Sequence, residues 1–288
     1  MSAGLEPLPA LVSTAWLAAR LGRPRLRSVD ASWYLPASRR DPAAEYAGGH
    51  LPGAIFFDLD ASSDPGSPLP HMLPEAGVFG RRMAALGLDD ADDIVVYDGS
   101  GTNISAARVW WTFRVFGHPR VAVLDGGMGK WRAEGRPVEV GSVVLPPGRF
   151  SARLNRAAVR DLAAIQANLV GRAEQIVDMR ASGRFAGREP EPRPGLRGGH
   201  IPGSLSLPYT DLVAADGTLL PLDQLRRRIA AAGVDPTRPV VATCGSGTSA
   251  CVLLLALHLL GQDRAALYDG SWAEWGGRDD TPVSGGSA

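Results

Sequence analysis

The second half of the sequence repeats the first, and this repeat constrains the fold more than any other feature. Four landmarks recur in the same order, at offsets of 148, 150, 146 and 144 residues. They are SVD at 28–30 and IVD at 176–178, GHLPG at 49–53 and GHIPG at 199–203, IVVYDGSG at 94–101 and VVATCGSG at 240–247, and LDGG at 124–127 and YDGS at 268–271. The chain of 288 residues is therefore a tandem duplication.

Each half predicts alternating β-strands and α-helices. Short apolar, β-branched runs predict strands over residues 26–30, 55–57, 94–97, 121–124, 175–178, 204–207, 239–243 and 265–268. Longer apolar or amphipathic stretches predict helices over residues 74–86, 104–116, 222–232 and 249–260. This alternation predicts an α/β protein of two domains, each a parallel sheet flanked by helices, with ligands at the carboxyl ends of the strands. We expect the domains at residues 10–137 and 158–284, joined by a Pro- and Gly-rich linker over 138–157.

The segment around Cys244 has the clearest chemical meaning. A predicted strand leads into Cys244, a loop of small residues runs from Gly245 to Ser249, and an apolar helix follows. The N–H groups of such a loop and the positive end of a helix both favour an anion, and Thr248 or Ser249 is expected to cap the helix. We therefore predict that Cys244 is a nucleophilic thiolate, the alternative being a small buried hydrophobic residue. Position 250 is alanine, whereas a tyrosine phosphatase loop needs arginine there.

The first half lacks this chemistry. Asp98 occupies the position of Cys244, and a carboxylate cannot act as a thiol nucleophile. One catalytic half and one supporting half, with a site at their interface, is the simplest interpretation. His50 and His200 lie in the two Gly-His-x-Pro-Gly turns and are expected to be structural, and Cys251 on the apolar helix is expected to lie in the core.

Composition narrows the range of partners and compartments. The formal net charge is zero, so nothing indicates nucleic acid or an anionic membrane surface as a partner. No apolar run approaches the ~20 residues of a membrane span, and residues 1–9 lack the basic start and apolar core of a signal peptide, so we expect a cytoplasmic protein. Two cysteines seven positions apart predict neither a disulfide framework nor a zinc site, and no metal or cofactor is expected.

Together these landmarks resemble the tandem-domain rhodaneses over almost the whole chain. The sequence CGSG at 244–247 is similar to the cysteine loop of the 3-mercaptopyruvate sulfurtransferase branch, whereas thiosulfate sulfurtransferases carry basic side chains there. FFDLD at 56–60, PHMLP at 70–74, RVWW at 108–111, GRF at 183–185 and PEPR at 190–193 are similar to the same branch. The chain departs from the pattern at Thr248-Ser249, where valine and threonine are usual, and at Ala107, where proline is common.

The resemblance implies sulfur transfer through a persulfide on the cysteine, with pyruvate as the other product. Loop amides would stabilise the persulfide anion, and two arginines would bind the carboxylate and ketone of the donor. A hydroxyl, an imidazole and a carboxylate would form a proton relay, the last two supplied by the first half. The residues implied are Cys244, Ser246, His71 and Asp60 for catalysis, and Arg184, Arg193, Gly245, Gly247, Thr248 and Ser249 for substrate binding.

Two other functions stay open. A thiosulfate:cyanide sulfurtransferase would use the same fold and nucleophile, although the uncharged side chains of Gly245 and Ser246 favour a donor other than a dianion. A non-catalytic rhodanese-like binding module would leave Cys244 unreactive, which the intact loop disfavours. The expected partners are a small-molecule sulfur donor (3-mercaptopyruvate or thiosulfate) and an acceptor that is cyanide or a thiol such as thioredoxin.

Overall fold

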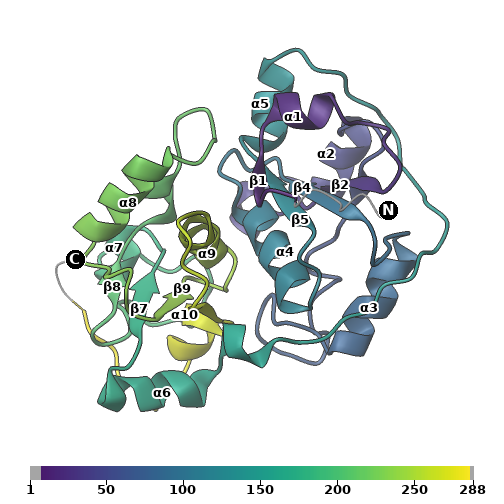
Figure 1. Cartoon of the computed structure of the whole chain (residues 1–288). Coiled ribbons are helices and arrows are strands. Elements are labelled where there is room, and N and C mark those ends of the chain that lie inside the picture. The colour runs from purple at the N-terminus through teal and green to yellow at the C-terminus, as the bar shows by residue number, and fades with distance from the viewer. Residues whose placement is uncertain (1–7, 286–288) are drawn as a thin grey trace, which may run out of the picture.

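The computed structural model describes residues 8–285 and contains two five-stranded sheets, one in each half of the chain (Figure 1). The first sheet has the strand order β1-β5-β4-β2-β3, and the second has the equivalent order β6-β10-β9-β7-β8. All pairings within the two sheets are parallel. The strands are β1 (Leu11–Val12), β2 (Leu26–Asp30), β3 (Ile55–Phe56), β4 (Asp93–Tyr97), β5 (Val121–Leu124), β6 (Val159–Arg160), β7 (Gln175–Asp178), β8 (Leu205–Ser206), β9 (Val240–Thr243) and β10 (Ala265–Tyr268).

Helices cover both faces of each sheet, because parallel strands need crossover connections. The helices are α1 (Thr14–Ala18), α2 (Pro42–Gly48), α3 (Ala76–Ala85), α4 (Ile104–Val115), α5 (Gly127–Ala133), α6 (Leu162–Gly171), α7 (Ser182–Phe185), α8 (Leu222–Ala231), α9 (Ala250–Leu259) and α10 (Ser271–Trp275). Short 3-10 helices are η1 (Pro36–Ser38), η2 (Arg156–Ala158) and η3 (Tyr209–Leu212). The predicted fold class, two parallel sheets flanked by helices, is confirmed. None of the helices within residues 8–285 is long and apolar enough to cross a bilayer.

The predicted strands and helices are all present, with ends that differ by at most two residues. The prediction missed β1 and β6 at the edges of the two sheets, because a strand of two residues shows no periodicity. It also missed α6 and the short helices α1, α2, α5, α7 and α10. The domain boundaries and the linker at residues 138–157 remain a prediction.

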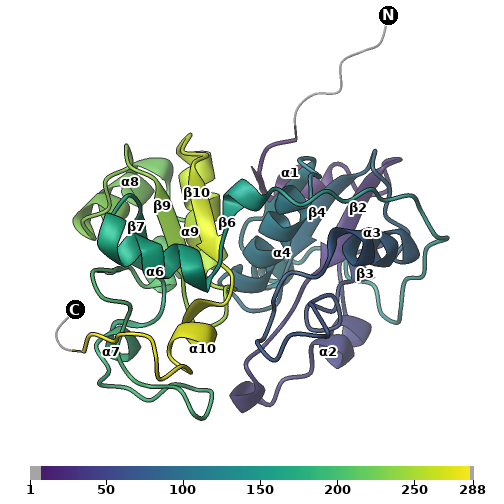
Figure 2. The same cartoon turned by 90° about the horizontal axis from the view of Figure 1, so that it is seen from below.

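The helices α4 and α9 lie side by side between the two sheets (Figures 1 and 2). Eight consecutive residues of α9, 250–257, are buried, and every residue of α4 except Ile104 and Arg114 is buried. A helix that is apolar on all sides must be covered on all sides, and each of these helices is covered by its own sheet and by its partner helix. One cluster of buried apolar residues therefore runs through both halves.

Each half also sends a loop onto the strand ends of the other half. The N–H of Leu73, in the loop before α3, donates to Asp269 Oδ2 at 2.8 Å. The N–H of Leu219, in the loop before α8, donates to Asp125 Oδ1 at 2.8 Å. The two aspartates follow β10 and β5 at aligned positions of the repeat. We call these segments, residues 60–73 and 213–219, the two crossing loops.

Candidate active site

The Cys244 loop lies between the end of β9 and the start of α9, and α10 holds its carbonyl groups. The N–H groups of Trp272 and Ala273 donate to the carbonyl oxygens of Cys244 and Gly245 at 3.0 and 2.8 Å. Within residues 8–285, no hydrogen bond leaves the N–H groups of residues 245–249. Cys244 itself is 2% exposed. Backbone donors left available directly after a buried cysteine suit an anion, and we call this arrangement the cradle.

The prediction that Thr248 or Ser249 caps α9 is wrong. Ser249 precedes the helix with φ −68° and ψ −20°, and its side chain makes no capping hydrogen bond. A capping side chain works from an extended backbone, and Ser249 is already helical. The hydroxyl of Thr248 instead lies 3.0 Å from His71 Nδ1.

The first crossing loop brings His71 and Asp60 to the Cys244 loop, where Ser246 meets them. His71 Nδ1 lies 3.0 Å from Ser246 Oγ, and His71 Nε2 lies 3.1 Å from Asp60 Oδ1. Trp33 holds Asp60 and His71 in place, since its Nε1–H donates to Asp60 Oδ2 at 3.0 Å and its ring packs edge-on against the imidazole of His71. The structure therefore joins a hydroxyl, an imidazole and a carboxylate in one chain of contacts.

The surroundings of His71 favour the neutral form of its ring. Burial lowers the pKa of His71, the positive charge of Arg108 lowers it further, and the hydrogen bond with Asp60 opposes both. The same hydrogen bond from His71 is the main reason that the pKa of Asp60 is lowered. An ionised Asp60 can only accept a hydrogen bond, so Nε2 of His71 is assigned the ring proton. The lone pair of the ring is then on Nδ1. The ring can therefore take up a proton on the side of Ser246.

Arg184 and Arg193 both reach the Cys244 loop. A Cβ atom built on Gly245 would lie 3.1 Å from Arg184 Nη2 and 3.9 Å from Arg193 Nη1. Arg184 lies in the short helix α7. Burial lowers the pKa of Arg193, and the neighbouring charge of Arg184 adds to this effect. Two guanidinium groups therefore stand over the glycine that follows the cysteine.

Sequence reasoning missed the groups that orient Arg184. Glu191 accepts hydrogen bonds from Arg184 and from Arg180 Nη1, the latter at 2.7 Å. Arg180 is fully buried and forms a two-pronged ion pair with Asp178 at the end of β7. The signal was present in the PEPR stretch, since a glutamate so close to two arginines is a natural partner for one of them.

Sequence reasoning also left Arg108 outside the site. Arg108 is 1% exposed, and its Nη1 lies 2.8 Å from Asp269 Oδ1 in an ion pair between the halves. Its Nη2 donates to the carbonyl oxygen of His71, and its Nη1 donates to that of Gly247 at 3.3 Å. One guanidinium group from α4 therefore joins the first crossing loop to the Cys244 loop. The signal was an arginine inside an otherwise apolar helix.

The remaining singled-out residues have structural contacts. Nδ1 of His50 and of His200 lies 2.9 Å from a carbonyl oxygen of the preceding segment, and both rings stack on an aromatic neighbour. Cys251 lies in the core, as predicted, and its Sγ–H donates to the carbonyl oxygen of Gly247 at 3.3 Å. Among residues 8–285, no group of His, Cys, Asp and Glu side chains is arranged to hold a metal ion.

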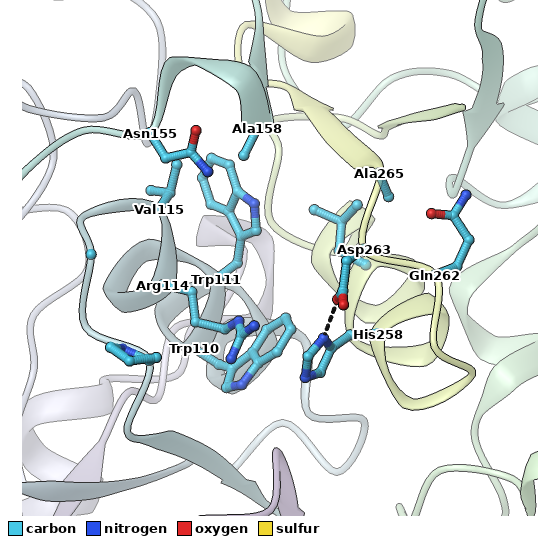
Figure 3. A pocket seen from close by; sticks show the side chains of 13 residues that line it. Trp110, Trp111, Arg114, Val115, Asn155, Ala158, His258, Gln262, Asp263 and Ala265 are labelled. Atoms are coloured by element: carbon cyan, nitrogen blue, oxygen red, sulfur yellow. Dashed lines mark hydrogen bonds and ion pairs between the residues drawn. The ribbon is translucent and has the colours of Figure 1, made fainter. Parts of the chain in front are cut away.

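A pocket lies at the C-terminal ends of α4 and α9, away from the Cys244 loop. This pocket of about 370 Å³ is lined by residues that include Trp110, Arg114, His258 and Asp263 (Figure 3). The guanidinium of Arg114 lies over the ring of Trp110, and His258 Nδ1 lies 2.6 Å from Asp263 Oδ1. None of the site residues predicted from the sequence lines it, so this pocket is separate from the candidate active site.

Comparisons with known proteins agree with the fold and with the resemblance. The family model for the rhodanese-like domain matches twice, at residues 13–134 and 161–278. The chain is 44% identical to human 3-mercaptopyruvate sulfurtransferase over 271 residues, which cover 92% of this chain and 91% of the human protein. It is 43% identical to bovine thiosulfate sulfurtransferase over 272 residues, which cover 92% of this chain and 91% of that protein.

A solved structure supports the same likeness. The crystal structure of SseA from Escherichia coli, described as a 3-mercaptopyruvate sulfotransferase with the rhodanese fold, superposes with a TM-score of 0.84. The sequences are 40% identical, and the match covers 91% of this chain and 98% of that one. The architecture of both halves therefore follows that of the bacterial protein.

Proposed function

The chain belongs to the rhodanese family, in its 3-mercaptopyruvate sulfurtransferase branch, and from this premise we propose that it carries sulfur on Cys244 as a persulfide. The observation that carries the proposal is the cradle itself: a buried thiol, surrounding backbone N–H groups, and two guanidinium groups over Gly245. The first half supplies His71 and Asp60 but no nucleophile, because Asp98 stands at the equivalent position.

The first half-reaction moves one sulfur atom from 3-mercaptopyruvate to the enzyme. The Cys244 thiolate attacks the sulfur of the donor, an S–S bond forms, and the C–S bond breaks with its electron pair on carbon. The leaving group is the enolate of pyruvate. The thiol proton of the donor ends on this carbon, so pyruvate is released and an anionic persulfide remains on Cys244. The loop N–H groups from Gly245 to Ser249, with Gly247 and Thr248 between them, stabilise that anion.

The proton passes through the relay of Ser246, His71 and Asp60. Since the pKa of His71 is lowered by burial, the ring is unprotonated near neutral pH and can accept a proton at Nδ1. Asp60 then stabilises the imidazolium through Nε2. The same groups return the proton to the enolate carbon.

The two arginines bind the donor. A 2-oxo acid offers a carboxylate and a ketone oxygen on one plane, which suits the fixed fork of a guanidinium group. Arg184 is partly neutralised by Glu191, so we assign the carboxylate to Arg193 and the ketone to Arg184. Near Cys244, the loop side chains of Gly245 and Ser246 are uncharged, which favours 3-mercaptopyruvate over the thiosulfate dianion.

A comparison of donors tests this function. With cyanide or reduced thioredoxin as acceptor, we expect kcat/KM for 3-mercaptopyruvate to exceed that for thiosulfate by about ten-fold or more. Cys244→Ser is expected to release no pyruvate, whereas Cys251→Ala keeps the reaction. Mass spectrometry of the intact chain after exposure to donor alone should detect one added sulfur atom. A preference for thiosulfate would make the chain a thiosulfate sulfurtransferase, and the absence of added sulfur would favour a binding module.

The second half-reaction returns the cradle to its free state. A thiolate such as that of thioredoxin, or cyanide, attacks the outer sulfur of the persulfide and leaves the Cys244 thiolate. Cytoplasmic thiols would be suitable acceptors, in keeping with the cytoplasmic location that the sequence predicts.

A further inference from the structure

Two hydroxyl groups meet the same nitrogen of His71. Ser246 Oγ and Thr248 Oγ1 each lie 3.0 Å from His71 Nδ1, and all three residues are buried. The other ring nitrogen faces Asp60 Oδ1 at 3.1 Å. A relay through Ser246 alone leaves the contact of Thr248 without a role.

One lone pair cannot serve both hydroxyl groups equally. With its proton on Nε2, the neutral ring of His71 offers a single acceptor site at Nδ1. A hydroxyl that donates to this site stabilises the neutral ring, and the other hydroxyl is then able to turn toward a ligand in the loop. When the ring carries a proton at Nδ1, either oxygen can accept the hydrogen bond.

We propose that Thr248 is a positioning residue for the proton relay: its hydroxyl shares the Nδ1 lone pair of His71 with that of Ser246 and holds the ring in place whenever the Ser246 hydroxyl is turned away from it. Thr248 also takes over this hydrogen bond when the hydroxyl of Ser246 is removed. The inference rests on the proposed function, because it assigns a second hydroxyl to the relay of that function. With this second hydroxyl, the activity should tolerate the loss of the Ser246 hydroxyl but not the loss of both hydroxyl groups.

A purely structural role for Thr248 makes a different prediction. A buried hydroxyl needs a partner, and His71 is one. If the contact only satisfied Thr248, replacing it with the isosteric valine would cost some stability and leave kcat unchanged, in the Ser246→Ala background as in wild type. The kcat of the double variant therefore separates the two roles.

The test compares wild type, Ser246→Ala, Thr248→Val and the double variant, with pyruvate release from 3-mercaptopyruvate as the activity. We expect Thr248→Val to lower kcat about two-fold and Ser246→Ala about ten-fold or less, because each hydroxyl substitutes for the other. The double variant should fall by about 300-fold or more, well beyond the product of the single effects. Additive effects, with Thr248→Val costing as little in the Ser246→Ala background as in wild type, would overturn the proposal.

The control is Thr243→Val, one position before the nucleophile. Thr243 is as buried as Thr248, but its hydroxyl has no hydrogen-bond partner within residues 8–285. We therefore expect Thr243→Val to leave kcat and the pKa of His71 as they are in wild type. Added to Ser246→Ala, it should leave both as they are in Ser246→Ala.

An NMR titration of His71 reads the hydrogen bond without turnover. In the Ser246→Ala background, adding Thr248→Val should raise the pKa of His71, because the neutral ring loses its remaining donor. An unchanged pKa would overturn the proposal. A wild-type chain that releases no pyruvate would refute the proposed function, and the titration would still decide whether Thr248 controls His71.

Discussion

The two crossing loops share one backbone arrangement, but only the first carries side chains of the proposed proton relay. In each, a backbone N–H donates at 2.8 Å to the aspartate after the last strand of the opposite sheet: Leu73 to Asp269, and Leu219 to Asp125. The duplication therefore built the same contact between the halves twice. The difference must come from the side chains around these two contacts.

Two aligned positions account for most of that difference. At the offset of 146 residues that relates Leu73 to Leu219, His71 aligns with Gly217 and Arg108 aligns with Leu254. His71 and Gly217 both have a left-handed backbone, with φ of +62° and +81°. The turn is thus common to both loops, and an imidazole and a guanidinium group distinguish them. We call the first, which carries the proposed relay, the catalytic crossing, and the second the structural crossing.

The two strand-end loops differ in a similar way. The Asp98 carboxylate accepts hydrogen bonds from the N–H and hydroxyl of Ser100, the hydroxyl of Ser105 and the N–H of Ala106, at 2.6 to 3.1 Å. This carboxylate therefore takes up hydrogen-bond donors of its own loop. The Cys244 loop keeps its N–H groups available for an anion that arrives from outside. One loop therefore stabilises the fold, and the other is suited to bind.

The largest expected effect comes from removing the guanidinium group that only the catalytic crossing has. Arg108→Met leaves Asp269 buried without its counter-ion, which costs about 3–5 kcal/mol of unfolding free energy. It also releases the carbonyl groups of His71 and Gly247, and a displaced relay is expected to lower kcat about 100-fold. Urea unfolding and pyruvate release measure the two effects.

Arg114→Met is the matched control on the same helix. Arg114 is partly exposed and lies over the ring of Trp110, so its loss should cost about 0.5–1 kcal/mol and leave kcat unchanged. Asp269→Asn in the Arg108→Met background should recover part of the lost stability, because it removes the uncompensated charge. Equal costs for Arg108→Met and Arg114→Met would show that the ion pair does not distinguish the crossings.

The sequence predicted the sheets better than it predicted the crossings. Strands and long helices follow from local apolar runs, and the repeat doubled each signal. The contact between Asp60 and His71 lies within one loop without periodicity, so only the resemblance to a family indicated it. Arg108 was missed because its partner, Asp269, lies in the other half, and no local pattern reveals a partner across an interface.

The missed strands and the wrong helix cap also have a physical cause. The strands β1 and β6 contain two residues each and are defined by their neighbours in the sheet and not by their own sequence. The expected cap at Ser249 is absent because that residue already has a helical backbone. Local propensity is a weak guide where the rest of the fold sets the backbone.

A smaller effect is expected from the strand-end loop of the first half. Asp98→Asn keeps the shape of the side chain but turns an N–H₂ group toward donors in its own loop, which costs about 1–3 kcal/mol of unfolding free energy. The Cys244 loop is built separately, so kcat should stay within about two-fold of wild type. Ser100→Ala removes only part of this network and should cost less. A large loss of kcat in Asp98→Asn would show that the supporting loop acts on the catalytic one.

The smallest effect concerns Asp125, the aspartate of the structural crossing, beside which residues 8–285 place no buried cation. Burial raises the pKa of Asp125 to about 6 from its ordinary 3.8, and the charge of Asp216 adds to the shift. The folded chain thus binds this proton more tightly than the unfolded chain does. Stability from this group is present below pH 4 and is lost as the pH rises through about 6. Because Asp125 is only partly buried, we expect a loss of about 1 kcal/mol.

Asp125→Asn should remove this pH dependence, since the amide cannot titrate but its oxygen still accepts the N–H of Leu219. The free energy of unfolding, measured in urea between pH 4 and pH 7, should then fall less steeply with rising pH than in wild type. Asp58→Asn is the matched control, since it removes an exposed carboxylate that accepts the N–H of Ala61 within its own loop. If Asp125→Asn kept the wild-type slope, Asp125 would not be the group that causes this pH dependence. The lack of a buried cation would then have no measurable effect at the structural crossing.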